Sequence, residues 1–338
     1  MKFQFSILLF SLFAVAFLKG DLSAQQKKLP PTGNKSDGGT IPANAKANPR
    51  IANVKDAKNK AIKKDVEKDP TLAEFAIYEK TAPNPEKTEP VETKLPLELK
   101  KGTRIAFVGN TLLDRGQDFG FFESYLHQAN PKNELVIRNF AWSADEVDLQ
   151  PRPDNFATVK QHLTREKIDV IFAAFGFNES FGGVEQIDAF KVRLTAYLLD
   201  LKTSAFNGKT GPQIVLVSPI ANENTERVKA GDLNNERLAA YTKAMSEVAA
   251  EQKVGFANVF EKTRDAMADT DSQLTINGAH LNEAGYEVFA DQAFSETFGK
   301  SAPDILPELR AVVIDKNRQY FRRYRPLNTF YYTGGRNK

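Results

Sequence analysis

The 338-residue sequence contains no cysteine, and it has only one tryptophan and three histidines. Without cysteine the chain cannot form disulfides, use a thiolate as a nucleophile, hold an iron–sulfur cluster or attach haem c covalently. A metal site built from several histidines would need nearly all three of them. We therefore expect no metal ion and no cofactor. The hydrophobic share of 41% still suffices for a folded core, which excludes disorder throughout the chain.

Nucleotide-binding motifs are also lacking. No Gly-x-Gly-x-x-Gly follows the first expected strand, and the chain contains no Gly-x4-Gly-Lys-Ser/Thr. The net charge is −7 over residues 101–300, whereas residues 25–70 carry +6 and residues 301–338 carry +5. An acidic centre between basic flanks argues against a nucleic-acid-binding core, so we expect no nucleic acid among the partners.

Residues 1–24 have the pattern of an export signal. Lys2 supplies the positive start, residues 3–18 form the apolar run, and Ala24 is a small residue suited to cleavage. The run stops at Lys19, short of the ~20 residues that a spanning helix needs. We expect a signal peptide and a periplasmic or extracellular protein with no transmembrane segment after signal removal. An uncleaved N-terminal anchor is the alternative.

The flanks of the central region differ from it in composition. Residues 25–70 are rich in Lys, Ala, Asn, Pro and Gly, which predicts a disordered basic linker or a basic arm that binds an anionic surface. Residues 71–100 are expected to form an extended segment that leads into the domain. Residues 301–338 form a basic, aromatic C-terminal tail, which we interpret as the point where a longer chain continues or as a docking site for a protein partner.

Between residues 101 and 300, short apolar runs alternate with segments of helical periodicity. Residues 170–175 are apolar on both faces, as a central parallel strand requires. The expected strands are 104–108, 135–137, 170–175, 214–217 and 256–260, and the expected helices are 121–128, 156–166, 187–202, 233–252 and 282–298. This alternation predicts an α/β domain, a doubly wound five-stranded parallel sheet with helices on both faces. Its working site should lie at the carboxyl ends of the strands.

Residues suited to acyl transfer follow those strand ends. The reaction needs a hydroxyl at a sharp strand-to-helix turn, a nearby imidazole, and donors directed at a developing oxyanion. Thr111 offers the hydroxyl, His280 the imidazole, and Asn178 an amide donor. The backbone N–H groups of Thr111 and Ala144 could complete an oxyanion hole.

Four segments resemble the four blocks of the SGNH (GDSL-type) hydrolase family, in the family's order. They are Gly109-Asn110-Thr111-Leu112, Asn139-Phe-Ala-Trp-Ser-Ala-Asp145, Gly176-Phe-Asn178-Glu179 and Asn277-Gly-Ala-His280. The resemblance implies a three-layer, flavodoxin-like sandwich and ester hydrolysis. It places Thr111 as the nucleophile and His280 as the base, with Asn277 where the family has the orienting acid. It assigns the oxyanion hole to the backbone N–H groups of Thr111 and Ala144 and to the side-chain amide of Asn178.

Four positions depart from the family pattern. Asn110 replaces an aspartate that braces the turn, and Thr111 replaces serine, whose hydroxyl lacks the crowding methyl. Ala144 replaces glycine, and we expect its N–H to remain a donor only if its φ angle is not positive. Asn277 replaces aspartate, so it can hold the imidazole but cannot stabilise an imidazolium by charge.

Other polar and aromatic residues have two interpretations each. Three carboxylates are expected on a solvated rim, with replacement of the missing acid as the alternative: Asp145, Glu179 and Glu223. Trp142 is expected in the core, with a sugar-stacking platform as the alternative. His127 and His162 are expected at ordinary surface or interface positions.

The sequence thus predicts an exported SGNH hydrolase that cleaves an ester, with O-acyl groups on extracellular carbohydrate as the suggested substrate class. The alternative is a catalytically weakened module that binds glycan or protein. The chain also resembles the SGNH-like N-terminal module of large exported planctomycete-type proteins, in which a haem-binding region follows.

Overall fold

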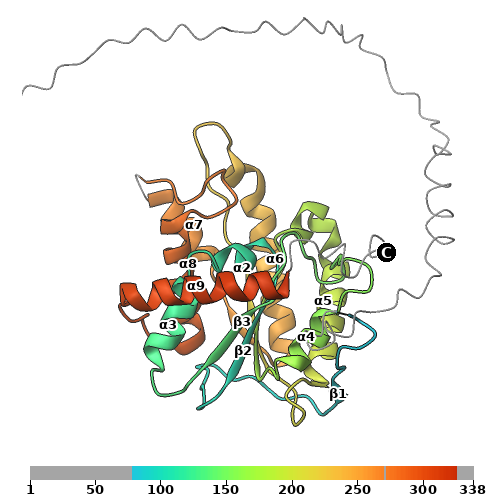
Figure 1. Cartoon of the computed structure of the whole chain (residues 1–338). Coiled ribbons are helices and arrows are strands. Elements are labelled where there is room, and N and C mark those ends of the chain that lie inside the picture. The colour runs from blue at the N-terminus through green and yellow to red at the C-terminus, as the bar shows by residue number, and fades with distance from the viewer. Residues whose placement is uncertain (1–77, 270–271, 326–338) are drawn as a thin grey trace, which may run out of the picture. The chain divides into compact units, whose positions relative to one another are not determined.

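The computed structural model describes residues 78–269 and 272–325 (Figure 1). The predicted signal peptide and basic linker lie outside the described residues, as does the end of the tail. Within the described part of the chain, no helix combines the length and apolar character that a membrane crossing requires.

The centre of the domain is a five-stranded parallel sheet in the order β3-β2-β4-β6-β7. Its strands are β2 (Arg104–Gly109), β3 (Val136–Asn139), β4 (Val170–Ala174), β6 (Gln213–Val217) and β7 (Gly255–Ala257). β4 is buried throughout, as expected for a strand covered on both faces. The predicted fold class is confirmed. The strand order reverses between β2 and β4, which is where such sheets place their sites.

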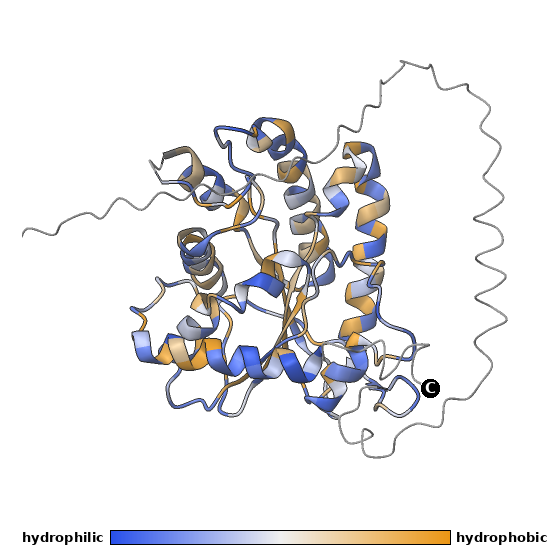
Figure 2. Ribbon diagram, turned by 45° about the horizontal axis from the view of Figure 1, so that its top comes forward, coloured by the Kyte–Doolittle hydropathy of each residue, from blue (hydrophilic) through white to orange (hydrophobic). Residues whose placement is uncertain are grey.

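Helices cover both faces of the sheet. One face carries α4 (Val159–Arg165), α5 (Ile187–Lys202) and α6 (Ala230–Gln252), and the other carries α3 (Phe121–Ala129) and α8 (Glu283–Phe298), with α7 (Phe260–Asp269) packed on α8. Successive residues of β4 alternate between the two cores, because side chains of a strand point to opposite faces. Figure 2 shows the apolar strands in the middle and helices of mixed character around them.

The residues before β2 lie along the domain. β1 (Glu86–Lys87) pairs antiparallel with β5 (Ser204–Ala205). Further on, the hydroxyl of Thr93 accepts the N–H of Ile214 at 2.8 Å, and the buried Leu97 donates its N–H to Thr297. These contacts attach the segment to β6 and α8.

Several expected boundaries were wrong by one to three residues, and hydrogen bonds explain two of the larger differences. The last strand ends at Ala257 instead of residue 260, because the hydroxyl of Ser218 accepts the N–H groups of Val259 and Phe260 and Phe260 begins α7. The helix expected from residue 156 begins at Val159, because Thr158 and Gln161 form a capping box there.

The tail contains a helix that the sequence analysis did not predict, α9 (Pro307–Tyr324). In Figure 1 this orange-red helix crosses α3 and β3. Lys316 forms an ion pair with the buried Glu123 of α3 and donates to the carbonyl of Ile137 in β3. Near its start, the guanidinium of Arg310 donates to Phe119 and lies 3.9 Å from the centre of the Phe121 ring. The described part of the tail therefore packs on the domain.

Candidate active site

The turn after β2 presents Thr111 at the carboxyl edge of the sheet. Gly109 has a φ of 121°, and a Cβ there would lie 2.1 Å from the carbonyl oxygen of Ala174, so only glycine lets β2 end this close to β4. Asn110 caps α2 (Thr111–Gly116), because its Oδ1 accepts the N–H of Leu112 at 3.1 Å. Asn110 thus braces the turn, and Thr111 occupies the first turn of α2.

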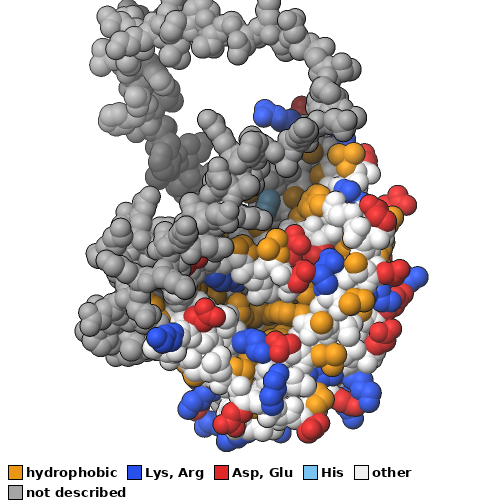
Figure 3. All heavy atoms as spheres, turned by 90° about the vertical axis from the view of Figure 1, so that its right-hand side faces the viewer, with side chains coloured by type: hydrophobic (Ala, Val, Ile, Leu, Met, Phe, Trp, Pro, Cys, Tyr) orange, Lys and Arg blue, Asp and Glu red, His pale blue; other side chains and the backbone are white. Residues whose placement is uncertain are grey.

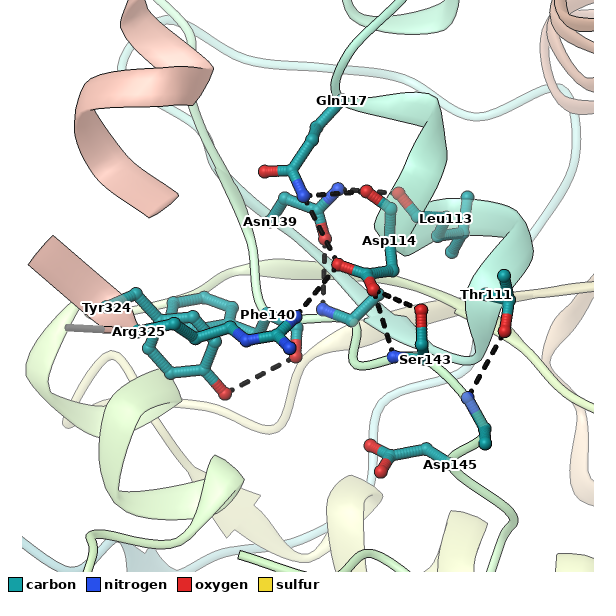
Figure 4. Close-up of polar contacts among 12 residues, drawn as sticks. Thr111, Leu113, Asp114, Gln117, Asn139, Phe140, Ser143, Asp145, Tyr324 and Arg325 are labelled. Atoms are coloured by element: carbon teal, nitrogen blue, oxygen red, sulfur yellow. Dashed lines mark hydrogen bonds and ion pairs between the residues drawn. The ribbon is translucent and has the colours of Figure 1, made fainter. Parts of the chain in front are cut away.

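Ala144 directs its backbone N–H at the Thr111 hydroxyl, with N and Oγ1 3.2 Å apart (Figure 4). Its φ is 66°, in the left-handed region that costs an alanine about 1 kcal/mol. The expectation that a positive φ would remove this donor was wrong. The turn around Ala144 is held by its neighbours: Asp114 accepts both the N–H and the hydroxyl of Ser143, at 3.0 and 2.5 Å.

Asn178 lies beside the same turn. Its Nδ2 donates to the carbonyl oxygen of Asp145 at 3.2 Å, from the start of the 3-10 helix η2 (Glu179–Gly182). No hydrogen bond joins Asn178 to Thr111 among the described residues. To act on an oxyanion, the amide would have to exchange its bond with Asp145 for one with the substrate.

The loop before α8 holds the His280 ring through Asn277. Oδ1 of Asn277 accepts the backbone N–H groups of Ala279 (3.2 Å) and His280 (2.9 Å). The ring Nδ1 lies 3.1 Å from this Oδ1 and 3.0 Å from Nδ2 of the same amide. When Nδ1 carries the proton and donates it to Oδ1, Nε2 keeps its lone pair and can take a proton. Asn277 therefore orients the ring but supplies no negative charge.

Thr111 and His280 line one pocket that is partly open to solvent. Much of its wall is apolar and comes from Phe175, Phe177, Pro219, Ile220 and Leu281. No hydrogen bond connects Thr111 with the His280 ring within the described part of the chain. Burial lowers the pKa of His280, and the guanidinium of Arg115 lowers it further. The imidazole is therefore neutral at neutral pH, the state that a general base requires.

A family model described as the GDSL-like Lipase/Acylhydrolase family matches residues 108–288, more than half of the chain. The chain belongs to this family. The match spans the turn after β2, the Ala144 turn and the His280 loop. No curated protein is significantly similar to the chain in sequence.

Solved structures that are similar to the chain include esterases. Two variants of Axe2 from Geobacillus are similar over 61% of the chain with TM-scores of 0.48. One, an acetyl-xylooligosaccharide esterase, is 18% identical over 98% of its own length, and the other, an acetyl xylan esterase, is 17% identical over 99%. A protein described as a GDSL-like lipase from Parabacteroides merdae is 17% identical over 60% of this chain and 99% of its own, with a TM-score of 0.47.

The three carboxylates expected on a solvated rim are all buried, so that expectation was wrong. Each carboxylate has partners within the fold. Asp145 pairs with Arg152 through both oxygens, at 2.7 and 2.6 Å. Glu179 accepts the backbone N–H groups of Val147 and Gly176, and Glu223 accepts those of Leu274 and Thr275. None of them is hydrogen-bonded to His280, so none replaces the acid of the GDSL family. Among the described residues, no three His, Asp or Glu side chains cluster as metal ligands.

Trp142 is half-buried, and guanidinium groups cover its ring. The Cζ atoms of Arg325 and Arg152 lie 3.7 and 4.4 Å from the ring centre. These contacts compete with a sugar for the ring. The expectation for His162 was wrong, because it is buried against Phe140, Phe156 and Tyr324 and burial lowers its pKa to about 3. His127 is half-buried and lies 3.5 Å from Glu123.

Sequence reasoning missed two residues next to the site. Asp114, in α2, holds Ser143, and Arg325 at the end of α9 pairs with Asp114 (Figure 4). Asp114 stands three positions after Thr111, a spacing that puts both on one side of a helix. Arg325 follows more than 200 residues later, so only the packing of α9 reveals it.

Proposed function

We propose that this GDSL-family protein hydrolyses an ester through Thr111 and His280. The observation that carries the proposal is that Thr111, whose hydroxyl accepts the Ala144 N–H, lines one pocket together with His280. Nε2 of His280 takes the hydroxyl proton as Oγ1 attacks the ester carbon. The Ala144 N–H then passes from Oγ1 to the developing oxyanion.

The second half of the reaction returns the enzyme to its starting state. The imidazolium gives its proton to the alcohol that leaves, and an acyl-enzyme remains on Thr111. Water loses a proton to His280 and attacks the acyl carbon. The bond from that carbon to Oγ1 then breaks, His280 returns the proton to Oγ1 of Thr111, and the acid leaves. The missing bond between Thr111 and His280 would form on rotation of the threonine side chain, since catalytic hydrogen bonds often tighten only with substrate bound.

We propose a short acyl group as the part of the substrate that enters the pocket. The apolar wall formed by Phe175, Phe177, Pro219 and Ile220 suits a methyl or ethyl group beside the ester carbon. The alcohol part would remain outside, towards solvent. The resemblance to exported SGNH proteins supports an extracellular carbohydrate as this alcohol part, so that the substrate would be an O-acylated carbohydrate.

Export is part of the proposal. The pattern of residues 1–24 supports a cleaved signal, and the resemblance to the module of exported planctomycete-type haem-binding proteins is in keeping with it. Intact-mass analysis of the protein from the expression host should give a chain that begins at Gln25. A mature protein that retains Met1 would contradict cleavage.

A binding module is the second candidate, and Asn277 favours it. The amide cannot stabilise an imidazolium by charge, and Arg115 disfavours that cation further. Such a site could retain the pocket for ligand binding with little turnover.

Hydrolysis of p-nitrophenyl acetate by the wild type, by Thr111→Ala and by the exposed loop variant Thr210→Ala decides between the candidates. Hydrolysis by the wild type and Thr210→Ala that falls to the buffer rate in Thr111→Ala supports the esterase. Equal rates in all three folded proteins and in buffer would refute it and favour the binding module.

A further inference from the structure

The turn of residues 142–145, which carries the Ala144 donor, lies between α2 and the end of α9. Its Ser143 is held by one oxygen of Asp114, Oδ2. The other oxygen, Oδ1, lies 3.0 Å from Nη1 of Arg325. In Figure 4 the carboxylate of Asp114 lies between the Arg325 side chain and Ser143. One carboxylate thus connects the C-terminal helix to the donor turn.

Arg325 contacts the turn in a second way. Its guanidinium carbon lies 3.7 Å from the centre of the Trp142 ring, the residue that begins the turn. The backbone N–H of Trp142 donates to the carbonyl oxygen of Gly109 at 2.9 Å. The backbone carbonyl of Trp142 accepts the N–H of Asp145 at 3.0 Å. A cation against the face of an indole is stabilising, more so when it is screened from water.

The donor turn needs such support. Ala144 is in the left-handed region, which alanine adopts only when the surroundings hold it there. Asp114 is buried, and removing one partner of a buried ion pair is strongly destabilising. Without Arg325, Asp114 would lose its cationic partner and with it part of its hold on Ser143.

We propose that Arg325 is a positioning residue for ester hydrolysis. It holds Asp114 by an ion pair and Trp142 by a cation–π contact, and the two together hold the Ala144 N–H on the reacting oxygen. The inference rests on the proposed esterase function. It assigns a role to α9, which begins after residue 288, where the family match ends.

The test compares Arg325→Gln with Arg322→Gln, an exposed arginine of the same helix. We expect Arg325→Gln to lower kcat for p-nitrophenyl acetate about tenfold with KM nearly unchanged, because loss of one oxyanion donor costs about 100-fold or more and Arg325 acts only through others. Arg322→Gln should keep the wild-type kcat. Arg325→Lys, which keeps a positive charge beside Asp114, should recover most of the loss.

Trp142 supplies a readout that is independent of turnover, because it is the single tryptophan of the chain. Acrylamide should quench its fluorescence more strongly in Arg325→Gln than in the wild type and Arg322→Gln. In an Asp114→Asn background, Arg325→Gln should change kcat less, since the part of its effect that passes through Asp114 is already lost.

The outcomes separate this inference from the proposed function. An active wild type with unchanged kcat in Arg325→Gln would overturn the inference and leave the esterase intact. So would equal losses in Arg325→Gln and Arg322→Gln, or a lysine variant no better than glutamine. An inactive wild type would overturn the proposed function and this inference with it.

Discussion

In the proposed site, Asn277 has an amide where the resemblance to the family implies a carboxylate, and the local structure can accept the acid. The Asn277 side chain is exposed, and its Oδ1 accepts two backbone N–H groups that would also bond a carboxylate. An aspartate here would be solvated and hydrogen-bonded, so it should not destabilise the loop.

We predict that Asn277→Asp raises kcat/KM at least tenfold, and more than Thr111→Ser does. A carboxylate stabilises the imidazolium of the transition state, whereas serine and threonine hydroxyls have similar intrinsic reactivity. In serine proteases the reverse change, from aspartate to asparagine, lowers kcat by a factor of ~10⁴. The measurement is hydrolysis of p-nitrophenyl acetate by both single variants and the double variant. A gain confined to Thr111→Ser would identify the methyl group as the obstacle.

The pH profile gives a second residue-scale prediction. Burial and Arg115 lower the pKa of His280, so the neutral ring, and with it kcat/KM, should persist to below pH 6.5 on the acid side. Asn277→Asp places a negative charge at Nδ1, which favours the protonated ring. The acid limb of the kcat/KM profile of Asn277→Asp should therefore lie at higher pH than that of the wild type. Coincident limbs would contradict a His280 base next to residue 277.

At the scale of elements, the connection from β2 to α2 is the most constrained part of the site. We predict that Gly109→Ala lowers the free energy of unfolding by more than about 2 kcal/mol, because its Cβ would meet the Ala174 carbonyl at 2.1 Å. Gly102→Ala is the matched control: its φ of 78° is also positive, but no atom lies within 4 Å of the added Cβ. Gly102→Ala should lower the free energy of unfolding by about 1 kcal/mol.

Urea unfolding followed by circular dichroism measures both variants. Similar losses for Gly109→Ala and Gly102→Ala would mean that backbone strain, and not the approach of β2 to β4, explains the glycine.

For the whole molecule, Glu179 couples stability to pH. It accepts N–H groups from the segments after β3 and β4, and burial raises its pKa to about 7 from an ordinary 4.5. Glu146 and Tyr241 are the other titratable groups facing it. The folded protein holds this proton more tightly than the unfolded chain does. The resulting stabilisation is fully present below about pH 4.5 and is lost as the pH rises through about 7.

We predict that the wild type loses about 3 kcal/mol relative to Glu179→Gln between pH 4.5 and 8, since each pKa unit corresponds to about 1.4 kcal/mol. Glutamine resembles the neutral acid and does not titrate. Unfolding free energies at several pH values measure this, with the exposed Glu226→Gln as control. A constant difference between wild type and Glu179→Gln would show that Glu179 ionises normally.

The face of the molecule shown in Figure 3 carries charges of both signs. On the face shown in Figure 3, Lys and Arg side chains alternate with Asp and Glu among apolar ones, without one continuous basic patch.

Local pattern was sufficient for the sheet and for most helices. Strands such as β4 are apolar on both faces, and α5 has its predicted bounds, Ile187–Lys202, because its apolar residues recur at helical spacing. Motif order also located Thr111 and His280, since residues that follow parallel strands meet at one sheet edge. These features depend on neighbours in the sequence.

The rest was decided by tertiary contacts. Ser218 ends the last strand through hydrogen bonds to Val259 and Phe260, about 40 positions away. Asp145, Glu179 and Glu223 look like surface residues in sequence, yet folding buries them against backbone N–H groups or Arg152. The contact of Arg325 with Asp114 joins residues 211 positions apart. No periodicity or motif encodes such a distance, because burial and pairing exist only once distant segments have packed together.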